Sequence, residues 1–190
     1  MEWRAAPVVS RGVWERGFYA HREDDAIPGI LWMPEQPPGP VPLVLIGHGG
    51  KSHKRNPADL SVARRFVRRH GIAACAIDAP SHGDRGPIID NGDGPAQPEY
   101  LDLWKTPETF DRMNADWSAT LDALLGSGRF REDNVGYWGL SMGTVLGLPF
   151  VGSDRRIAAA VLGACGLTQR GRRLGLVAGR LRADAPGLTC

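Results

Sequence analysis

The stretch that decides the fold is residues 134–148, which read NVGYWGLSMGTVLGL. Residues 134–138 favour a β-strand and residues 144–148 favour a helix. Between them, residues 139–143 have the pattern G-x-S-x-G. Glycine at both ends of that pattern removes the Cβ atoms that would clash where the chain turns back on itself. The sequence therefore predicts a sharp turn from strand to helix, with Ser141 at its tip.

A serine at such a turn is a candidate nucleophile. The pattern G-x-S-x-G between a strand and a helix is the nucleophile elbow of serine hydrolases, which presents the serine hydroxyl above the sheet. A hydroxyl is a weak nucleophile, so the site also needs a histidine base and a carboxylate that orients it. The alternative is a chance match in which the serine only caps the helix. The strand and helix on either side favour the catalytic interpretation, and Ser141 is the catalytic residue that we predict.

Composition favours an ordinary globular protein of one domain. The chain has 190 residues, of which 42% are hydrophobic and 23% are charged, and its net charge is +2. This charge is too small to indicate nucleic acid or an anionic membrane as a partner. The three cysteines, Cys75, Cys165 and Cys190, are too few for a disulfide framework. We find no signal peptide and no apolar run of membrane-spanning length, so we expect a cytoplasmic protein.

Strands and helices alternate along the chain from residue 42 onward. We expect strands at 12–20, 27–33, 42–46, 72–78, 134–138 and 157–162, and helices at 57–70 and 106–125. Residues 80–105 are polar and rich in glycine and proline, which predicts a long loop. This order predicts an α/β fold with a mostly parallel twisted sheet flanked by helices.

A second glycine-rich segment, Gly47-His48-Gly49-Gly50, follows the third expected strand. Together with the elbow after the fifth strand, this segment resembles the α/β-hydrolase superfamily over residues 12 to about 165. The resemblance implies an oxyanion hole formed by the backbone N–H groups of Gly50 and Met142. The alternative is an ordinary glycine-rich turn. We interpret His48 as a structural residue of this loop and not as the base.

Residues 78–86 resemble the superfamily's turn D-x-P-x-H-G-x-S/R-G. The resemblance implies that Asp78 and His82 fix a tight loop beside the active site. A metal site could instead draw on both of these residues and on His48, His53 and Asp84. Their spacing matches no standard zinc motif, so we predict no metal and no cofactor.

The segment after the elbow lacks a histidine. All five histidines precede Ser141, and the carboxylates after it are Asp154 and Asp184. The superfamily has the chain order serine, acid, histidine. We therefore expect residues 1–190 to form a single α/β-hydrolase domain, namely its N-terminal portion without the last strands, with 167–185 as a cap or connecting helix. The acid and the histidine would come from a segment absent from this chain or from a second chain.

The resemblance is to the esterase and dienelactone-hydrolase branch. Dienelactone hydrolases carry cysteine at the nucleophile position, so Ser141 favours esterase chemistry. The implied function is a carboxylic ester hydrolase that cleaves a small-molecule ester through an acyl-enzyme. Peptidase and thioesterase activities remain open on the same machinery. The alternative from another class is a catalytically silent interaction protein.

Overall fold

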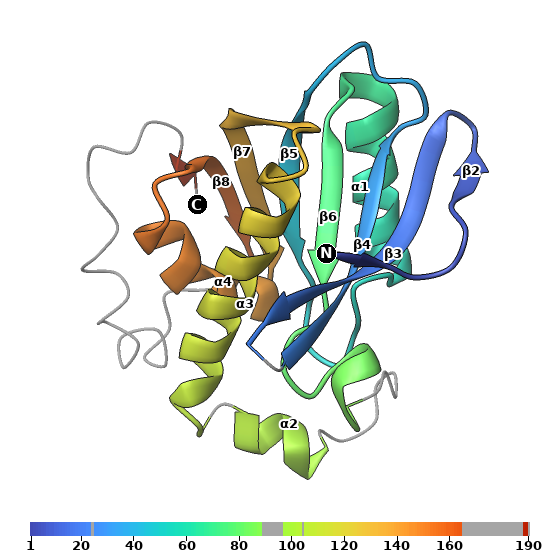
Figure 1. Ribbon diagram of the computed structural model, residues 1–190. Helices are drawn as coiled ribbons and strands as arrows, with labels where there is room; N and C mark the ends of the chain where they lie inside the picture. Colours follow the sequence, from blue (N-terminus) through green and yellow to red (C-terminus); the bar gives the residue numbers. More distant parts are fainter. Residues whose placement is uncertain (24, 89–96, 104, 165–187, 190) are drawn as a thin grey trace.

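The computed structural model describes residues 1–23, 25–88, 97–103, 105–164 and 188–189 (Figure 1). The strands are β1 (Glu2–Trp3), β2 (Val8–Ser10), β3 (Val13–Arg22), β4 (Asp25–Pro34), β5 (Val41–Gly47), β6 (Ala73–Ile77), β7 (Phe130–Leu140), β8 (Ile157–Gly163) and β9 (Leu188–Thr189). The helices are α1 (Pro57–His70), the 3-10 helix η1 (Gly83–Arg85), α2 (Pro98–Leu103), α3 (Glu108–Leu125) and α4 (Met142–Ser153).

All strands belong to one nine-stranded sheet in the order β1-β3-β4-β6-β5-β7-β8-β9, with β2 paired to β3. Strands β6, β5, β7, β8 and β9 run parallel to one another. The remaining strands, β1 to β4, form an antiparallel edge that joins the parallel part through the pair β4 and β6. The carboxyl ends of β5, β6 and β7 therefore meet at one edge of the sheet, which is the lower edge in Figure 1. The predicted α/β architecture with a mostly parallel sheet is confirmed.

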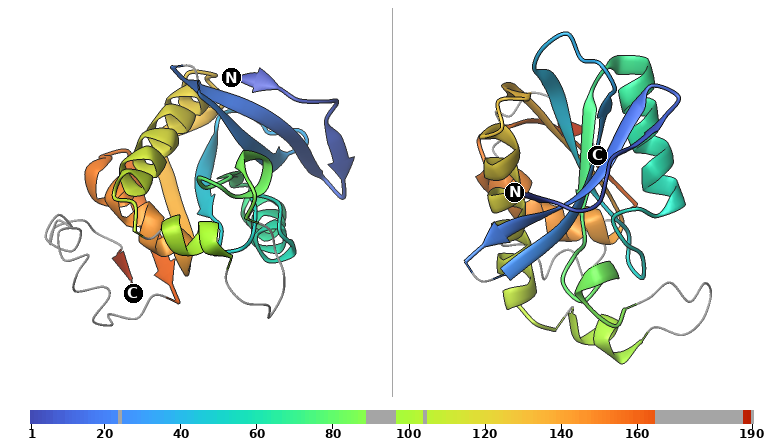
Figure 2. Two further views of the ribbon diagram at one scale, coloured as in Figure 1. Left: turned by 90° about the horizontal axis from the view of Figure 1, so that it is seen from below. Right: turned by 45° about the vertical axis from the view of Figure 1, so that its right-hand side comes forward.

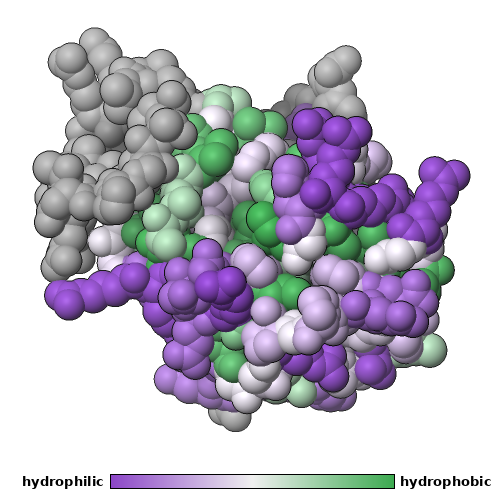
Figure 3. Space-filling view, turned by 90° about the horizontal axis from the view of Figure 1, so that it is seen from above, coloured by the Kyte–Doolittle hydropathy of each residue, from purple (hydrophilic) through white to green (hydrophobic). Residues whose placement is uncertain are grey.

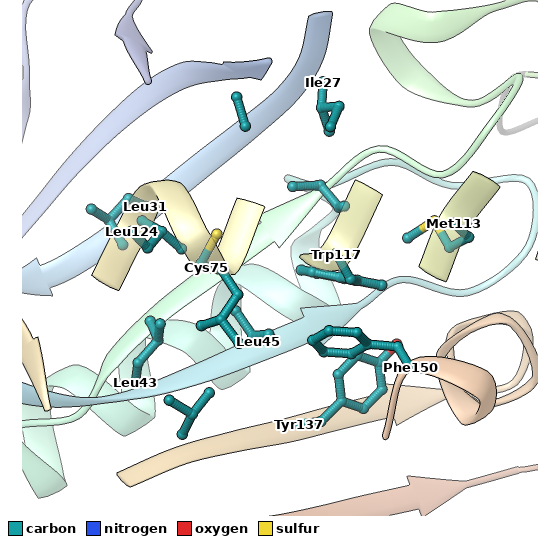
Figure 4. Packing of buried hydrophobic residues seen from close by; sticks show 14 of the residues in the cluster. Ile27, Leu31, Leu43, Leu45, Cys75, Met113, Trp117, Leu124, Tyr137 and Phe150 are labelled. Carbon is teal, nitrogen blue, oxygen red and sulfur yellow. The ribbon is translucent and has the colours of Figure 1, made fainter. Parts of the chain in front are cut away.

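Helices cover both faces of the sheet, with α3 and α4 on one side and α1 on the other (Figure 2). Side chains of β5 alternate between the two faces. Leu43 and Leu45 belong to the larger hydrophobic cluster under α3 and α4, whereas Val44 and Ile46 belong to the cluster under α1. In the larger cluster, the rings of Trp117, Tyr137 and Phe150 pack together beside Leu45 (Figure 4).

Helix α1 shows how local signals set its ends. The Asn56 side chain accepts a hydrogen bond of 3.0 Å from the Asp59 N–H and so caps the first turn. Gly71 ends the helix in the left-handed conformation, with φ +65°. The helix predicted at 57–70 is therefore confirmed at both ends.

Other expectations need correction. The expected loop at 80–105 contains η1 and α2, which are too short to give a clear periodic signal. Helix α3 begins at Glu108 and not at residue 106, and β7 is longer than 134–138. The short strands β1 and β2 were not predicted, because each is defined by pairing with β3. Strand β9 contributes two residues beside β8, and the helix predicted at 167–185 lies outside the described residues.

Within the parts of the chain that the structure describes, no helix is both long and apolar enough to cross a membrane. Seen from above, hydrophilic side chains are spread over the surface, with hydrophobic groups between them (Figure 3). The candidate site lies at the other edge, where the carboxyl ends of the parallel strands meet.

Candidate active site

Ser141 lies at the tip of a tight turn between β7 and α4, and it is exposed. Its backbone has φ +53° and ψ −116°, a conformation that costs a non-glycine residue about 1–3 kcal/mol. The Ser141 N–H donates a 2.9 Å hydrogen bond to the Gly163 carbonyl at the end of β8. The turn predicted from the sequence is thus present, and a neighbouring strand holds it in its strained geometry.

Glycines allow α4 to approach the sheet at this turn. A Cβ atom on Gly143 would lie 2.0 Å from the Gly47 carbonyl oxygen, and one on Gly139 would lie 2.7 Å from the Gly143 oxygen. A Cβ on Gly47 would meet the Tyr137 hydroxyl at 2.2 Å. The first and last residues of G-x-S-x-G are therefore required by packing, as predicted. The same contact brings the end of β5 against the first turn of α4.

Two buried side chains that the sequence analysis missed fasten this turn. The Thr144 Oγ1 atom lies 2.8 Å from the carbonyl oxygens of Gly139 and Gly163, and it accepts a 3.1 Å hydrogen bond from the Gly163 N–H. The Tyr137 hydroxyl donates a 2.7 Å hydrogen bond to the Gly143 carbonyl, and burial raises the pKa of this tyrosine. Thr144 could have been suspected from its place in the first turn after the elbow.

The two expected oxyanion donors lie beside this turn. Met142 is the first residue of α4, so its N–H points out of the positive end of the helix dipole. Gly50 lies in the loop after β5, and that loop approaches the elbow, since a Cβ on Gly49 would lie 4.0 Å from the Leu140 oxygen. Within the described part of the chain, neither the Met142 N–H nor the Gly50 N–H donates a hydrogen bond.

Gly50 is also in contact with helix α2. A Cβ on Gly50 would lie 2.3 Å from the Tyr100 hydroxyl and 2.8 Å from two ring carbons. Glycine at position 50 therefore makes room for the Tyr100 ring, in addition to the oxyanion role expected of its N–H group. No local pattern predicts this contact, because it joins a loop and a short helix that lie far apart along the chain.

His48 is a structural residue of the loop after β5. Its Nε2 accepts a 3.0 Å hydrogen bond from the Ala79 N–H, and its Nδ1 lies 2.8 Å from the Gly49 carbonyl. A carbonyl can only accept, so Nδ1 carries the proton. The side chain is buried, and this burial lowers the pKa of His48 to about 4. Because both nitrogens are engaged and the ring stays neutral, His48 cannot act as the base for Ser141.

Asp78 holds the turn after β6. Its carboxylate accepts hydrogen bonds from the Lys54 N–H (2.8 Å), the Lys54 ammonium (2.6 Å) and the Asp84 N–H (2.9 Å). A Cβ on Gly83 would lie 2.4 Å from that carboxylate, and φ at Gly83 is +54°. The His82 Nδ1 donates to the Pro80 carbonyl at 2.9 Å, and burial lowers the pKa of His82. Both Asp78 and His82 have the structural role that we expected.

A buried ion-pair network anchors this turn to the rest of the domain. Arg85 donates a 2.6 Å hydrogen bond to the fully buried carboxylate of Asp116 on α3, and a 3.1 Å hydrogen bond to the Asp78 carbonyl. Arg22 on β3 also donates to Asp116, at 3.0 Å. Removing one partner from such a network is strongly destabilising, because it leaves a buried charge unpaired. The turn beside the candidate site is therefore rigidly placed.

Among the described residues, the Ser141 hydroxyl makes no hydrogen bond, and so no histidine is bonded to it. His53 accepts from the Arg55 N–H at 3.2 Å, His21 lies 3.5 Å from Glu2, and the ring of His70 packs near Phe66. Among the described residues, no three His, Cys, Asp or Glu side chains are grouped to hold a metal ion.

Two grooves of about 630 and 520 Å³ lie on the helix surfaces and not at Ser141. The first is lined by residues of α3 and α4, and the second by residues of α1. Neither is lined by Ser141, Gly50 or Met142. The candidate site is therefore defined by its turn and its backbone donors and not by either groove.

A mixed sheet with helices on both faces, and a serine at the strained turn between a central strand and a helix, define the α/β-hydrolase class. No family model matches the sequence, and no curated protein matches it. Solved structures do match. An esterase from an Arctic intertidal metagenomic library, described as cold-adapted, is 35% identical with a TM-score of 0.79, and the match covers 95% of this chain and 74% of that esterase.

Two more distant structures share the fold. An acetyl xylan esterase from Paenibacillus sp. R4 is 21% identical, with a TM-score of 0.66, over 90% of this chain and 57% of that one. A dienelactone hydrolase-like promiscuous phosphotriesterase from metagenomic libraries is 20% identical, with a TM-score of 0.65, over 90% and 66% of the two chains. The identity and coverage of the Arctic esterase show the family: this chain belongs to the esterase branch of the α/β-hydrolase superfamily.

Proposed function

We propose that this protein is a serine esterase that cleaves a small carboxylic ester through an acyl-enzyme on Ser141. The observation that carries the proposal is an exposed serine on a strained turn, beside two backbone N–H groups that have no partner among the described residues. Those donors belong to Met142 and Gly50. The 35% identical Arctic esterase supports ester hydrolysis as the reaction.

In the proposed mechanism, the Ser141 oxygen attacks the ester carbonyl carbon and its proton passes to a base. The carbonyl oxygen becomes negative and accepts hydrogen bonds from the N–H groups of Met142 and Gly50. The tetrahedral intermediate collapses, the alcohol leaves with the proton, and water then hydrolyses the acyl-enzyme. Donors fixed in advance stabilise the developing charge, and losing one typically lowers the rate by about 10²–10³.

The base and the acid that orients it are proposed to come from outside these 190 residues, either from further chain or from a second chain. No histidine follows Ser141 in the sequence, and His48 and His82 hold loops together. The Arctic esterase is also longer, since this chain spans 74% of it. The absence of a base among the described residues keeps a catalytically silent interaction protein as the second candidate.

Covalent labelling combined with chemical rescue tests the proposal. The 190-residue chain, verified by intact mass, is treated with a fluorophosphonate probe and assayed with p-nitrophenyl acetate, with and without added imidazole as a soluble base. The comparison includes Ser141→Ala and a control, Ser153→Ala, at the end of α4. Subtracting the Ser141→Ala rate removes the hydrolysis that imidazole catalyses by itself.

We expect a trace of activity, because donors and binding alone still give roughly 10³–10⁴ over water when triad members are removed. Labelling at Ser141 should be slow without a base and faster with imidazole. Imidazole should raise the Ser141-dependent rate, and Ser153→Ala should behave like the unmodified chain. Equal labelling of Ser141→Ala would exclude this serine. Full activity without imidazole would instead place the base at His48, His53 or His82, which single substitutions to alanine would identify.

A further inference from the structure

Helix α2 places an aromatic side chain directly against the candidate oxyanion loop. The Tyr100 ring is half-buried and packs against the larger hydrophobic cluster, and it occupies the space that a side chain on Gly50 would fill. The atom nearest to that space is the phenolic oxygen, 2.3 Å from where a Cβ would be. A group that binds beside Gly50 on this side of the loop therefore meets the Tyr100 ring.

We propose that Tyr100 limits the length of the acyl chain that the site accepts. The proposal rests on the esterase function proposed above, and it assigns a specificity-determining residue to that reaction. The expected substrates are esters of short acids, because the ring leaves no room beside Gly50 for a longer chain.

Two fixed histidine rings hold Tyr100 in this place. The His82 ring meets the Tyr100 ring edge-on, with centroids 6.0 Å apart and an interplanar angle of 81°. The His48 ring packs in turn against the His82 ring, with ring centroids 5.3 Å apart. Each histidine is buried and has its Nδ1 bonded to a backbone carbonyl, so neither ring is free to rotate. The three aromatic rings thus connect the rigid turn after β6 to the oxyanion loop.

The same histidines indicate which part of the ester faces Tyr100. The leaving alcohol takes its proton from the base that deprotonated Ser141, so the alcohol lies on the side of that base. On the Tyr100 side, His48 has both nitrogens engaged, and the His82 ring is fully buried with its Nδ1 committed to Pro80. As part of the proposal, we place the base supplied from elsewhere on the other side and the acyl chain on the side of Tyr100.

The size of the effect follows from the space that the ring occupies. Each methylene removed from water improves binding about fourfold. Replacing Tyr100 by alanine removes seven heavy atoms, the ring and its hydroxyl, and a 10-fold gain needs only about two methylenes of a longer chain to enter that space. Opening this space should therefore raise the preference for a long acyl chain over acetyl by roughly 10-fold or more.

The test compares p-nitrophenyl acetate, butyrate and octanoate, which share one leaving group and differ only in the acyl chain. The measured quantity is the ratio of Ser141-dependent kcat/KM for octanoate to that for acetate, with the Ser141→Ala rate subtracted. A ratio cancels the low absolute rate of a chain that lacks its base. The variants are Tyr100→Ala, Tyr100→Phe and the control Leu101→Ala, which alters an exposed neighbour on the same helix.

Tyr100→Ala should raise the ratio roughly 10-fold or more, whereas Tyr100→Phe and Leu101→Ala should stay within about twofold of the unmodified chain. An unchanged ratio in Tyr100→Ala, with Ser141-dependent turnover still present, overturns the inference. An equal rise in Leu101→Ala also overturns it, because the effect would then belong to the helix and not to the ring. Loss of Ser141 dependence in all variants would instead count against the esterase function itself.

Discussion

The hydrogen bonds of Thr144 at the elbow give the sharpest prediction, because a second buried threonine, Thr120, serves as a matched control. Thr144 and Thr120 are both buried, with 3% and 0% of their surface exposed. The Thr144 hydroxyl accepts from the Gly163 N–H and donates to the carbonyl of Gly139 or Gly163. The Thr120 hydroxyl has no hydrogen-bond partner among the described residues. The same substitution, threonine to valine, therefore removes two hydrogen bonds at one site and none at the other.

Thr144→Val should lower the free energy of unfolding by about 2–3 kcal/mol. Each lost hydrogen bond contributes about 1 kcal/mol, and an N–H left without a partner costs about 1 kcal/mol more where water does not reach it. The Gly163 carbonyl keeps the hydrogen bond from the Ser141 N–H, so it adds little to the cost. Thr120→Val should change the free energy of unfolding by less than about 0.5 kcal/mol, or stabilise the protein, because a buried unpaired hydroxyl is replaced by a methyl group.

The assay is urea unfolding of both variants, followed by circular dichroism and fluorescence, with the slope of the unfolding free energy against urea compared between variants. An equal cost for the two substitutions would refute the argument, since it would assign the loss to repacking of the methyl groups and not to the hydrogen bonds at the elbow. A cost below 0.5 kcal/mol for Thr144→Val would show that the turn does not depend on this hydroxyl.

Two further predictions concern packing and pH. Gly143→Ala should lower the free energy of unfolding by about 3 kcal/mol, because its Cβ would lie 2.0 Å from the Gly47 oxygen, whereas Gly39→Ala, with nothing within 4 Å, should be neutral within about 0.5 kcal/mol in the same urea assay. His48 has a pKa near 4 when folded and 6.5 as its ordinary value, so the unfolded chain binds the proton first. The free energy of unfolding should be at its full value above pH 6.5 and fall by up to about 1.4 kcal/mol per pH unit down to pH 4. The pKa of His82 is also lowered by burial, so this residue adds to the loss in the same direction. A free energy of unfolding that stays constant over this window would contradict the burial argument.

Much of the fold could be predicted from local patterns. The helix at 57–70 was correct at both ends, because an asparagine cap and a left-handed glycine act within a few residues of the helix. The strands at 42–46 and 72–78 were close to the observed bounds, since buried parallel strands are continuous apolar runs. Helix α2 was missed, because six residues are too few to show a helical period.

Part of the candidate site could also be predicted from local sequence, and part could not. The sharp turn at Ser141 could be predicted because packing requires glycine at residues 139 and 143, which lie within five consecutive residues. The two expected backbone donors have no partner among the described residues, and their catalytic role remains a prediction. The interpretation of His48 as structural agrees with its two hydrogen bonds, although no pattern in the sequence could have named Ala79 as a partner.

The sequence by itself determined the α/β order of elements, the sharp turn at Ser141 and the absence of a histidine after it, because each is a property of neighbouring residues or of composition. Only the tertiary structure decided that Gly143 packs on Gly47, that Thr144 ties the turn to the end of β8, and that Tyr100 lies against Gly50. These contacts join segments about 20 to 100 residues apart. They arise when the sheet brings the carboxyl ends of its parallel strands to one edge, and no local preference of the chain encodes which side chains then meet.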